Sequence, residues 1–251
     1  MTANRSTAVM QRRAVAPDEL DYFPTQPWAV RAACEFMAAE LGEDLSTQTC
    51  WEPACGELFM VRPLREYFAH VIASDIFRYH PDHAIHDFLS NGPTFARPDW
   101  IFTNPPFLVA DQFVARAIER TRRGVVMFVR GAFTEGMDRY EALFRPEIRP
   151  AWVVTYCERV VLLRGRLIRS GAPDPFNVDP VTLEPRRASS ATAYSLVIWQ
   201  PGQHDTRHRW IPACRTRLER DEDYPAYEAQ WAELRRLQAA HAAELGQERM
   251  L

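Results

Sequence analysis

The 251-residue chain contains no lysine, so all 30 of its Lys/Arg cations are arginines. Every basic side-chain contact is therefore made by a guanidinium group, whose planar fork of donors suits phosphate and carboxylate partners. The arginines are unevenly spread, since residues 115–170 hold 12 of them against 6 acids, whereas residues 1–114 hold 8 against 15. An acidic first half followed by an arginine-rich segment permits a polyanionic partner on one face of the protein.

Long apolar runs and secretory features are also missing. No run approaches the roughly 18 residues of a transmembrane helix, and the first residues lack the apolar core of a signal peptide. The five cysteines, at positions 34, 50, 55, 157 and 214, contain no C-x-x-C pair, so neither a disulfide framework nor a zinc site is expected. With 47% hydrophobic and 25% charged residues, the composition is that of a globular protein, for which we expect a cytoplasmic location.

Short apolar segments with strand character alternate with segments of helical spacing. Strands are expected at residues 49–52, 70–75, 100–103, 124–129 and 151–157, and helices between Thr25 and Gly42 and at 63–68, 111–122 and 135–144. This alternation predicts parallel βαβ units in a doubly wound α/β sheet. Residues 160–163 and 193–199 also have strand character, and the loop between them is too polar for a crossover helix, so we expect a terminal antiparallel pair.

Three parts are expected along the chain: a flexible arm at residues 1–19, a main domain at 20–200 and a C-terminal extension at 201–251. The extension ends in an amphipathic helix whose apolar side holds Tyr227, Trp231, Leu234 and Leu245. We expect this helix to pack on the main domain, with a contact to a second copy or another partner as the alternative. Both a monomer and a homodimer fit the sequence.

Residues 52–58 follow the first expected strand and contain Glu52-Pro53-Ala54-Cys55-Gly56. In an open α/β sheet, ligands bind beyond the carboxyl ends of the strands. Gly56 allows the backbone to approach a ligand closely, and the Glu52 carboxylate can accept hydrogen bonds from a ligand amine or hydroxyl. An ordinary strand and turn with a buried Cys55 is the alternative interpretation.

Asp75 ends the next expected strand and is followed by Ile76. A carboxylate at this position can accept hydrogen bonds from both hydroxyls of a ribose, although it can also simply begin a surface loop. The chain has no G-x-G-x-x-G phosphate loop, which disfavours NAD and favours a nucleoside without phosphates. Asp87 and Phe88, twelve residues later, could present a carboxylate and a ring to a heterocycle.

The segment Asn104-Pro105-Pro106-Phe107 follows the strand expected at 100–103. Two prolines remove two backbone donors, so nearby carbonyl groups stay free to accept hydrogen bonds. Asn104 adds a side-chain acceptor and Phe107 adds a flat aromatic face. Two acceptors beside an aromatic face suit an exocyclic amine on a planar base, whereas a structural proline turn would not require Asn104 or Phe107.

Taken in this order, the segments resemble the S-adenosylmethionine-dependent DNA methyltransferases that act on adenine N6, in the class whose cofactor half comes first. Residues 52–56 are similar to that family's E-P-x-C-G-x-G signature, with Leu58 where the family usually has glycine. Asp21-Tyr22-Phe23-Pro24-Thr25 resembles the aromatic-Thr-Pro stretch that closes over the methionine part of the cofactor, with Pro and Thr exchanged. Residues 129–144 also resemble phage and prophage adenine methyltransferases, and the resemblance covers about residues 20–200.

The resemblance implies a Rossmann-like methyltransferase fold with a mostly parallel seven-stranded sheet and a terminal antiparallel hairpin formed by 159–163 and 193–199. It implies direct methyl transfer to a base flipped out of DNA, with no metal. It places the cofactor at Phe23, Pro24, Thr25, Glu52, Pro53, Ala54, Cys55, Gly56, Asp75, Ile76, Asp87, Phe88 and Asn104, and catalysis at Asn104, Pro105, Pro106 and Phe107. The arginine-rich segment supplies candidate phosphate contacts at Arg130, Arg139, Arg159, Arg164 and Arg166.

Three alternatives remain. An Asn-Pro-Pro-aromatic tetrapeptide also suits methylation of guanine N2 in ribosomal RNA or of glutamine N5 in a protein. Enzymes of those kinds usually carry a D-x-G-x-G-x-G-like first motif and lack the N-terminal aromatic-Thr-Pro stretch. An idle module that binds cofactor and DNA without catalysis is the third alternative, which the intact tetrapeptide at residues 104–107 disfavours.

Overall fold

The computed structural model describes residues 21–91, 95, 97–203 and 205–248, with side chains described up to residue 243. The arm expected at residues 1–19 lies outside the described residues. The strands of the main sheet are β1 (Thr49–Glu52), β2 (His70–Asp75), β3 (Ala84–Ile85), β4 (Trp100–Thr103), β5 (Gly124–Arg130), β6 (Trp152–Tyr156), β9 (Tyr194–Trp199) and β10 (Arg207–Ile211). The helices are α2 (Pro27–Glu40), α3 (Val61–Leu64), α4 (Ala110–Arg120), α5 (Met137–Arg139), the π-helical η4 (Tyr140–Phe144), α6 (Arg215–Leu218) and α7 (Glu228–Glu248).

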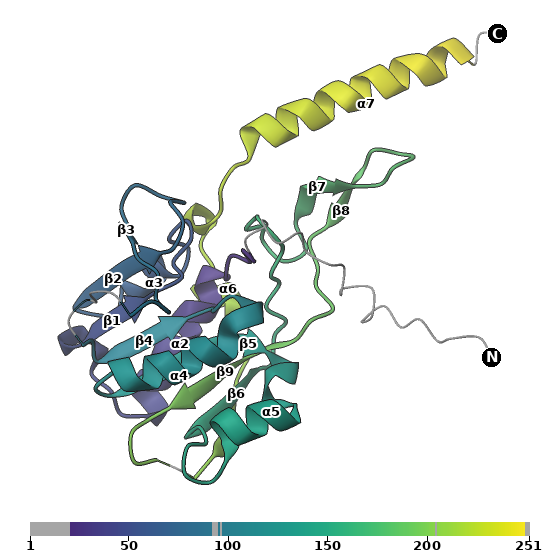
Figure 1. Cartoon of the computed structure of the whole chain (residues 1–251). Coiled ribbons are helices and arrows are strands. Elements are labelled where there is room, and N and C mark those ends of the chain that lie inside the picture. The colour runs from purple at the N-terminus through teal and green to yellow at the C-terminus, as the bar shows by residue number, and fades with distance from the viewer. Residues whose placement is uncertain (1–20, 92–94, 96, 204, 249–251) are drawn as a thin grey trace, which may run out of the picture.

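The eight strands form one sheet in the order β10-β6-β9-β5-β4-β1-β2-β3 (Figure 1). β9 is antiparallel to both of its neighbours, β5 and β6, and every other pairing in this sheet is parallel. The prediction of an α/β fold with a mostly parallel sheet is confirmed. The sheet has eight strands rather than seven because β3 and β10 add a strand at each edge, whereas residues 160–163 contribute none.

The prediction of a strand at 160–163 is wrong, and so is the prediction that it forms a hairpin with residues 193–199. Both hydrogen-bonding edges of β9 are taken by β5 and β6, which leaves no edge for a third partner. Val160 and Leu162 are instead buried in the core as part of a loop. The Val161 carbonyl accepts a hydrogen bond from the Gln26 side chain, 2.7 Å long, in place of a strand partner.

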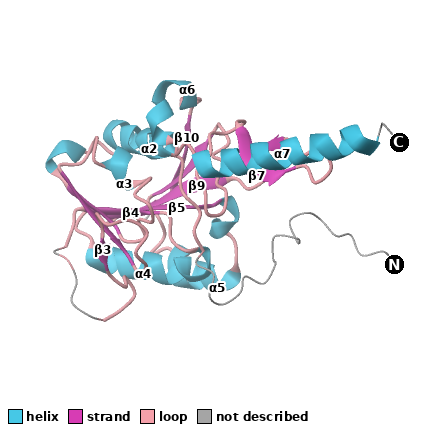
Figure 2. Ribbon diagram, turned by 90° about the horizontal axis from the view of Figure 1, so that it is seen from above, coloured by secondary structure: helices cyan, strands magenta, loops and turns pink. Residues whose placement is uncertain are grey.

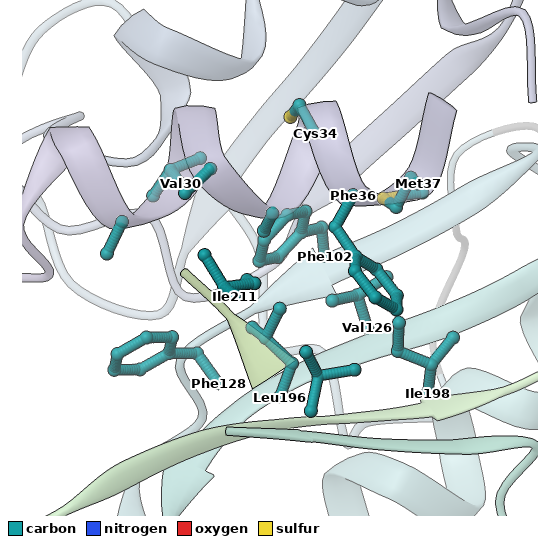
Figure 3. Close-up of a cluster of buried hydrophobic side chains, with 14 of the residues drawn as sticks. Val30, Cys34, Phe36, Met37, Phe102, Val126, Phe128, Leu196, Ile198 and Ile211 are labelled. Atoms are coloured by element: carbon teal, nitrogen blue, oxygen red, sulfur yellow. The ribbon is translucent and has the colours of Figure 1, made fainter. Parts of the chain in front are cut away.

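Helices cover both faces of the sheet (Figure 2). On one face α2 and α6 lie over the sheet, and α2 contributes Val30, Cys34 and Met37 to a core (Figure 3). Phe102 of β4 packs on this face, whereas its neighbour Ile101 packs on the other face, against α4. Side chains of β4 are therefore buried on both faces, as expected for a parallel sheet between two layers of helices.

Two of the predicted helices are shorter or less regular than expected. The helix predicted at 63–68 is the single turn α3, and the one predicted at 135–144 is split into α5 and η4. Gly136, with φ of 111°, precedes the split helix and sets the direction in which it starts. Residues 107–109, 131–134, 45–47 and 221–223 add short 3-10 turns, η2, η3, η1 and η5.

The chain between β6 and β9 forms an insertion that carries a separate antiparallel pair, β7 (Pro173–Val178) with β8 (Pro185–Arg187). Helix α7 projects from the body beside this pair (Figure 1). Of its predicted apolar side, Leu234 is buried, Tyr227 and Trp231 are half-buried, and the Leu245 side chain lies outside the described residues. The helix therefore packs on the insertion rather than on the main sheet. In the described part of the chain, no helix has both the length and the hydrophobicity of a membrane span.

Candidate functional site

The carboxyl ends of β1, β2 and β4 open into a cavity of about 390 Å³. The segments that the sequence singled out follow these three strands, and the cavity brings them together. Of the predicted site residues, its lining holds Phe23, Pro24, Thr25, Pro53, Ala54, Cys55, Asp75, Ile76, Asp87, Phe88, Asn104, Pro105, Pro106 and Phe107. Glu52 and Gly56 are the two predicted cofactor residues that are not part of this lining.

Asn104 lies just after β4, and the N-terminal segment that precedes α2 holds its side chain. Its Nδ2 donates to the Phe23 carbonyl at 2.9 Å and to the Thr25 hydroxyl at 3.0 Å. Its Oδ1 is buried and accepts no hydrogen bond from the described protein. Because a buried polar atom without a partner is costly, this oxygen is an acceptor available to a ligand in the cavity.

Phe107 is held by neighbours on two sides. Its main-chain amide donates a 2.6 Å hydrogen bond to Asp21 Oδ2, and the Phe23 ring lies at a centroid distance of 5.1 Å. The Arg130 guanidinium lies over the Phe107 ring, 3.8 Å from its centroid, in a cation–π contact. Arg130, predicted to reach phosphate, thus lies directly against the predicted base-stacking ring at the end of β5.

Glu52 lies behind the cavity wall and is fully buried. Its Oε1 accepts hydrogen bonds from the Ala54 amide at 2.9 Å and from the Thr103 hydroxyl at 2.5 Å. Burial raises the pKa of this carboxyl to about 8, and its Oε2 has no partner among the described residues. Glu52 thereby ties the turn after β1 to the residue that precedes Asn104.

The turn after β1 has two residues in the left-handed region, Gly56 at φ of 50° and Leu58 at φ of 69°. At Gly56 a Cβ would lie 2.4 Å from the Tyr22 ring, so only glycine lets Tyr22 pack here. Tyr22 also accepts a hydrogen bond from the Glu57 amide through its hydroxyl. Leu58, where the related signature has glycine, adopts the same class of backbone conformation while burying its side chain.

Asp75 ends β2 inside the cavity. Its Oδ2 accepts from the Gly56 amide at 2.9 Å and its Oδ1 from the Phe77 amide at 3.0 Å. Burial raises the pKa of this carboxyl, and the hydrogen bonds from the two amides oppose that effect. Each carboxylate oxygen has a second lone pair, so Asp75 can still accept from ligand hydroxyls.

Asp87 and Phe88 lie in the loop after β3. Asp87 is exposed at the rim, where its side chain accepts from the Leu89 amide at 3.0 Å. Phe88 is buried, with its ring edge-on to Trp51 at 5.1 Å and close to Phe113. A flat ligand group at this end of the cavity would therefore meet an aromatic ring and a carboxylate.

The four other predicted DNA contacts differ in how they are engaged. Arg139 pairs with Asp111 at 2.8 Å, and Arg166 pairs with the buried Asp174 at 2.7 Å. Arg159 is exposed and donates to the Ala191 carbonyl, and Arg164 is exposed in the insertion. Arg139 and Arg166 are thus paired with acidic side chains, whereas the side chains of Arg159 and Arg164 are exposed.

Several lining residues were not assigned a role from the sequence: Phe59, Met60, Tyr79, His86, Leu89, Val109 and Phe113. Tyr22 and Tyr79 form a ring pair with centroids 4.7 Å apart above the turn that contains Gly56. Asp21 and Tyr22, which belong to the stretch at residues 21–25, also line the cavity. Tyr79 and His86 lie in irregular segments without a motif, so the sequence offered no comparable signal for them.

No protein-family model and no curated protein matches the sequence. Among solved structures, a candidate RNA methyltransferase from Pyrococcus horikoshii has a TM-score of 0.50 at 14% identity, covering 77% of this chain and 94% of the other. The modification subunit of a candidate type I restriction enzyme from Vibrio vulnificus has a TM-score of 0.47 at 14% identity, covering 93% of this chain and 56% of the other. At such identities the likeness to the first structure is one of fold alone: this chain shares the α/β fold of that methyltransferase.

Proposed function

We propose that this protein is an S-adenosylmethionine-dependent methyltransferase that transfers a methyl group to the exocyclic N6 amine of adenine in DNA. The observation that carries the proposal is the buried Oδ1 of Asn104, which has no partner in the described protein and belongs to the lining of the same cavity as Asp75. An amine acceptor and a candidate ribose acceptor in one cavity suit a reaction between an amine and a nucleoside cofactor.

The cavity fits the proposed cofactor. Asp75 is buried with two lone pairs left over, which suits a pair of ribose hydroxyls. Phe88 and Asp87 suit the adenine ring and its amine. The segment Asp21–Thr25 also lines the cavity, in agreement with a role in closing over the amino-acid end.

When bound, S-adenosylmethionine supplies a methyl group activated on a sulfonium sulfur, so positioning is the main contribution of the protein. Asn104 Oδ1 accepts one hydrogen of the target amine. The Pro105 carbonyl accepts the other. With both hydrogens held, the nitrogen lone pair is directed away from the ring plane, as methylation of an amine requires.

Phe107 provides the aromatic face for the base. Because Arg130 lies over this ring, we expect the guanidinium to shift when a base stacks on Phe107, and its positive charge then becomes available to a nearby phosphate. A base in a duplex hides its amine in a pair, so the target is a flipped-out or unpaired adenine.

DNA is the proposed partner because exposed arginines lie close to the cavity. The Gly165 amide donates a 2.9 Å hydrogen bond to the Tyr22 carbonyl, which places the insertion against the segment that closes the site. Arg164 precedes Gly165, and the exposed Arg159 lies a few residues earlier. These side chains are proposed to contact the phosphate backbone next to the target base.

Identification of the methylated product tests the proposal. Purified protein is incubated with isotopically labelled S-adenosylmethionine and either DNA that lacks N6-methyladenine or ribosomal RNA, and digested nucleosides are separated by mass spectrometry. We expect label in N6-methyladenine from DNA. Label only in N2-methylguanine from RNA would contradict DNA as the substrate, and no transfer to either nucleic acid would contradict the proposal.

A further inference from the structure

The Asn104 side chain is oriented by two acceptors from the segment before α2. The Phe23 carbonyl is 2.9 Å and the Thr25 hydroxyl 3.0 Å from Nδ2. Thr25 is only 2% exposed, so its hydroxyl has a fixed environment. The interaction joins two parts of the chain that are about 80 residues apart in sequence.

The acceptor character of the Phe23 carbonyl determines which end of the Asn104 amide faces the segment before α2. A backbone carbonyl can only accept hydrogen bonds, so the group next to the Phe23 oxygen has to be the NH₂ of Asn104. Turning the amide over would set Oδ1 against that carbonyl oxygen and leave both without a donor. The unpartnered Oδ1 therefore faces away from the Phe23 carbonyl.

We propose that the Phe23 carbonyl and the Thr25 hydroxyl are positioning groups that fix the orientation of the Asn104 amide and restrict this position to asparagine. The inference rests on the proposed function for its consequence in catalysis, but its structural part does not depend on that function. It predicts that aspartate, although an acceptor of similar shape, does not replace asparagine at position 104.

An aspartate at position 104 would place a second carboxylate oxygen against the Phe23 carbonyl. A proton on that oxygen restores a donor to the Phe23 carbonyl, whereas ionisation sets two acceptors against each other. The Thr25 hydroxyl can rotate to donate, but the carbonyl cannot. Asn104→Asp is therefore expected to resemble wild type most closely at low pH and to lose stability and activity as pH rises.

The other ionisable groups around position 104 belong to several elements. Asp21 and Tyr22 lie on the segment before α2, Glu52 is bonded to Thr103, and Arg130 lies over Phe107. The cavity also holds Asp75, Tyr79, His86 and Asp87, and Tyr194 packs near Phe107. These groups are common to wild type and every variant. Comparing the melting temperature or the activity of a variant with that of wild type at the same pH therefore removes their contribution, and what remains is due to the new carboxylate.

The first experiment measures thermal unfolding of wild type, Asn104→Asp and Asn104→Ala between pH 5 and pH 8. The alanine variant loses the same hydrogen bonds without adding an ionisable group. We expect the melting temperature of Asn104→Asp to fall progressively further below that of wild type as pH rises, because the folded state raises the pKa of the new carboxyl. The deficit of Asn104→Ala should be constant. A constant deficit for Asn104→Asp would overturn the inference, whatever reaction the protein catalyses.

The second experiment measures methyl transfer to duplex DNA by Thr25→Val, Thr25→Ser and Asn104→Asp. Thr25→Val keeps the shape but removes the acceptor, and we expect kcat to fall about fivefold or more, the equivalent of one neutral hydrogen bond. Thr25→Ser should restore wild-type kcat, because the serine hydroxyl again provides an acceptor for Asn104 Nδ2. Equal activity of Thr25→Val and wild type would overturn the role of Thr25, whereas an inactive wild type would contradict the proposed function instead.

Discussion

The main-chain amide of Gly56 donates a 2.9 Å hydrogen bond to Oδ2 of Asp75, so the turn after β1 and the acid that ends β2 form one unit. A ligand held by Asp75 therefore lies next to the turn in which glycine permits the close approach of Tyr22. The acid thus has two tasks, because it orders the turn and keeps lone pairs for the proposed cofactor.

Replacing Asp75 should weaken cofactor binding far more than it weakens folding. Asp75→Ala removes charge-assisted hydrogen bonds to the ribose, each worth about 1.5–3 kcal/mol, so we expect the Kd for S-adenosylmethionine to rise at least about tenfold. Isothermal titration calorimetry measures this Kd. Asp82→Ala is the matched control, since Asp82 is exposed and lies outside the cavity lining. Equal affinity of the Asp75 variant and wild type would remove this residue from the site.

The strands that carry the site were predictable, whereas its cross-chain contacts were not. β1, β2 and β4 have the bounds expected from the sequence because each has a short apolar centre that ends at polar or turn-forming residues. Since ligands bind at the carboxyl ends of such strands, the positions of Asp75 and Asn104 followed. Arg130 over Phe107 and Tyr22 against Gly56 depend on tertiary packing that no local pattern encodes.

The two errors in the strand predictions, at β10 and at residues 160–163, also arise from tertiary packing. β10 is an edge strand whose first four residues are exposed, so its sequence lacks the apolar alternation of a covered strand. Residues 160–163 have strand-like composition, but their hydrophobic side chains fill the core from a loop because β9 already has two partners. For both segments, composition predicts whether the side chains are buried better than it predicts whether the backbone pairs with another strand.

At position 58, we expect glycine to destabilise the protein less than alanine does, which is the reverse of the usual order. Its φ of 69° is strained for any residue except glycine, and its side chain is buried. Leu58→Ala loses the buried side chain and keeps the strain, while Leu58→Gly loses the side chain and relieves the strain. We expect both to lower the free energy of unfolding, with alanine worse by about 1 kcal/mol. Urea denaturation at neutral pH measures the order, and a more stable alanine variant would contradict this backbone assignment.

Glu52 should make stability depend on pH. Burial raises its pKa in the folded protein to about 8, above its unfolded value, so the protonated form is the better tolerated one. The stability it contributes is present below the unfolded pKa and is lost as pH rises toward 8. Glu52→Gln mimics the protonated form, so we expect wild type to lose on the order of 1–3 kcal/mol relative to this variant between pH 5 and pH 9. Parallel denaturation curves at all pH values would contradict a raised pKa.

We expect substitutions of Arg159 and Arg164 to affect DNA binding and a substitution of Arg166 to affect stability. Replacing Arg159 and Arg164 together should reduce the slope of log K against log salt for duplex DNA, by about 0.9 for each phosphate that is no longer neutralised. Arg166→Ala instead leaves the buried Asp174 without its ion-pair partner, and we expect stability to fall by about 3–5 kcal/mol. Binding titrations at several salt concentrations measure the first effect. An unchanged slope for the double variant would place the phosphate-binding surface elsewhere.

Methyl transfer by Asn104→Ala tests the central claim most directly. Removing the amine acceptor should lower transfer to adenine in DNA by at least about two powers of ten, equivalent to roughly 3 kcal/mol of transition-state stabilisation. Calorimetry should find nearly unchanged affinity for S-adenosylmethionine, because Asp75 and the Phe88 ring remain. Transfer to adenine N6 at the wild-type rate by Asn104→Ala would contradict the account.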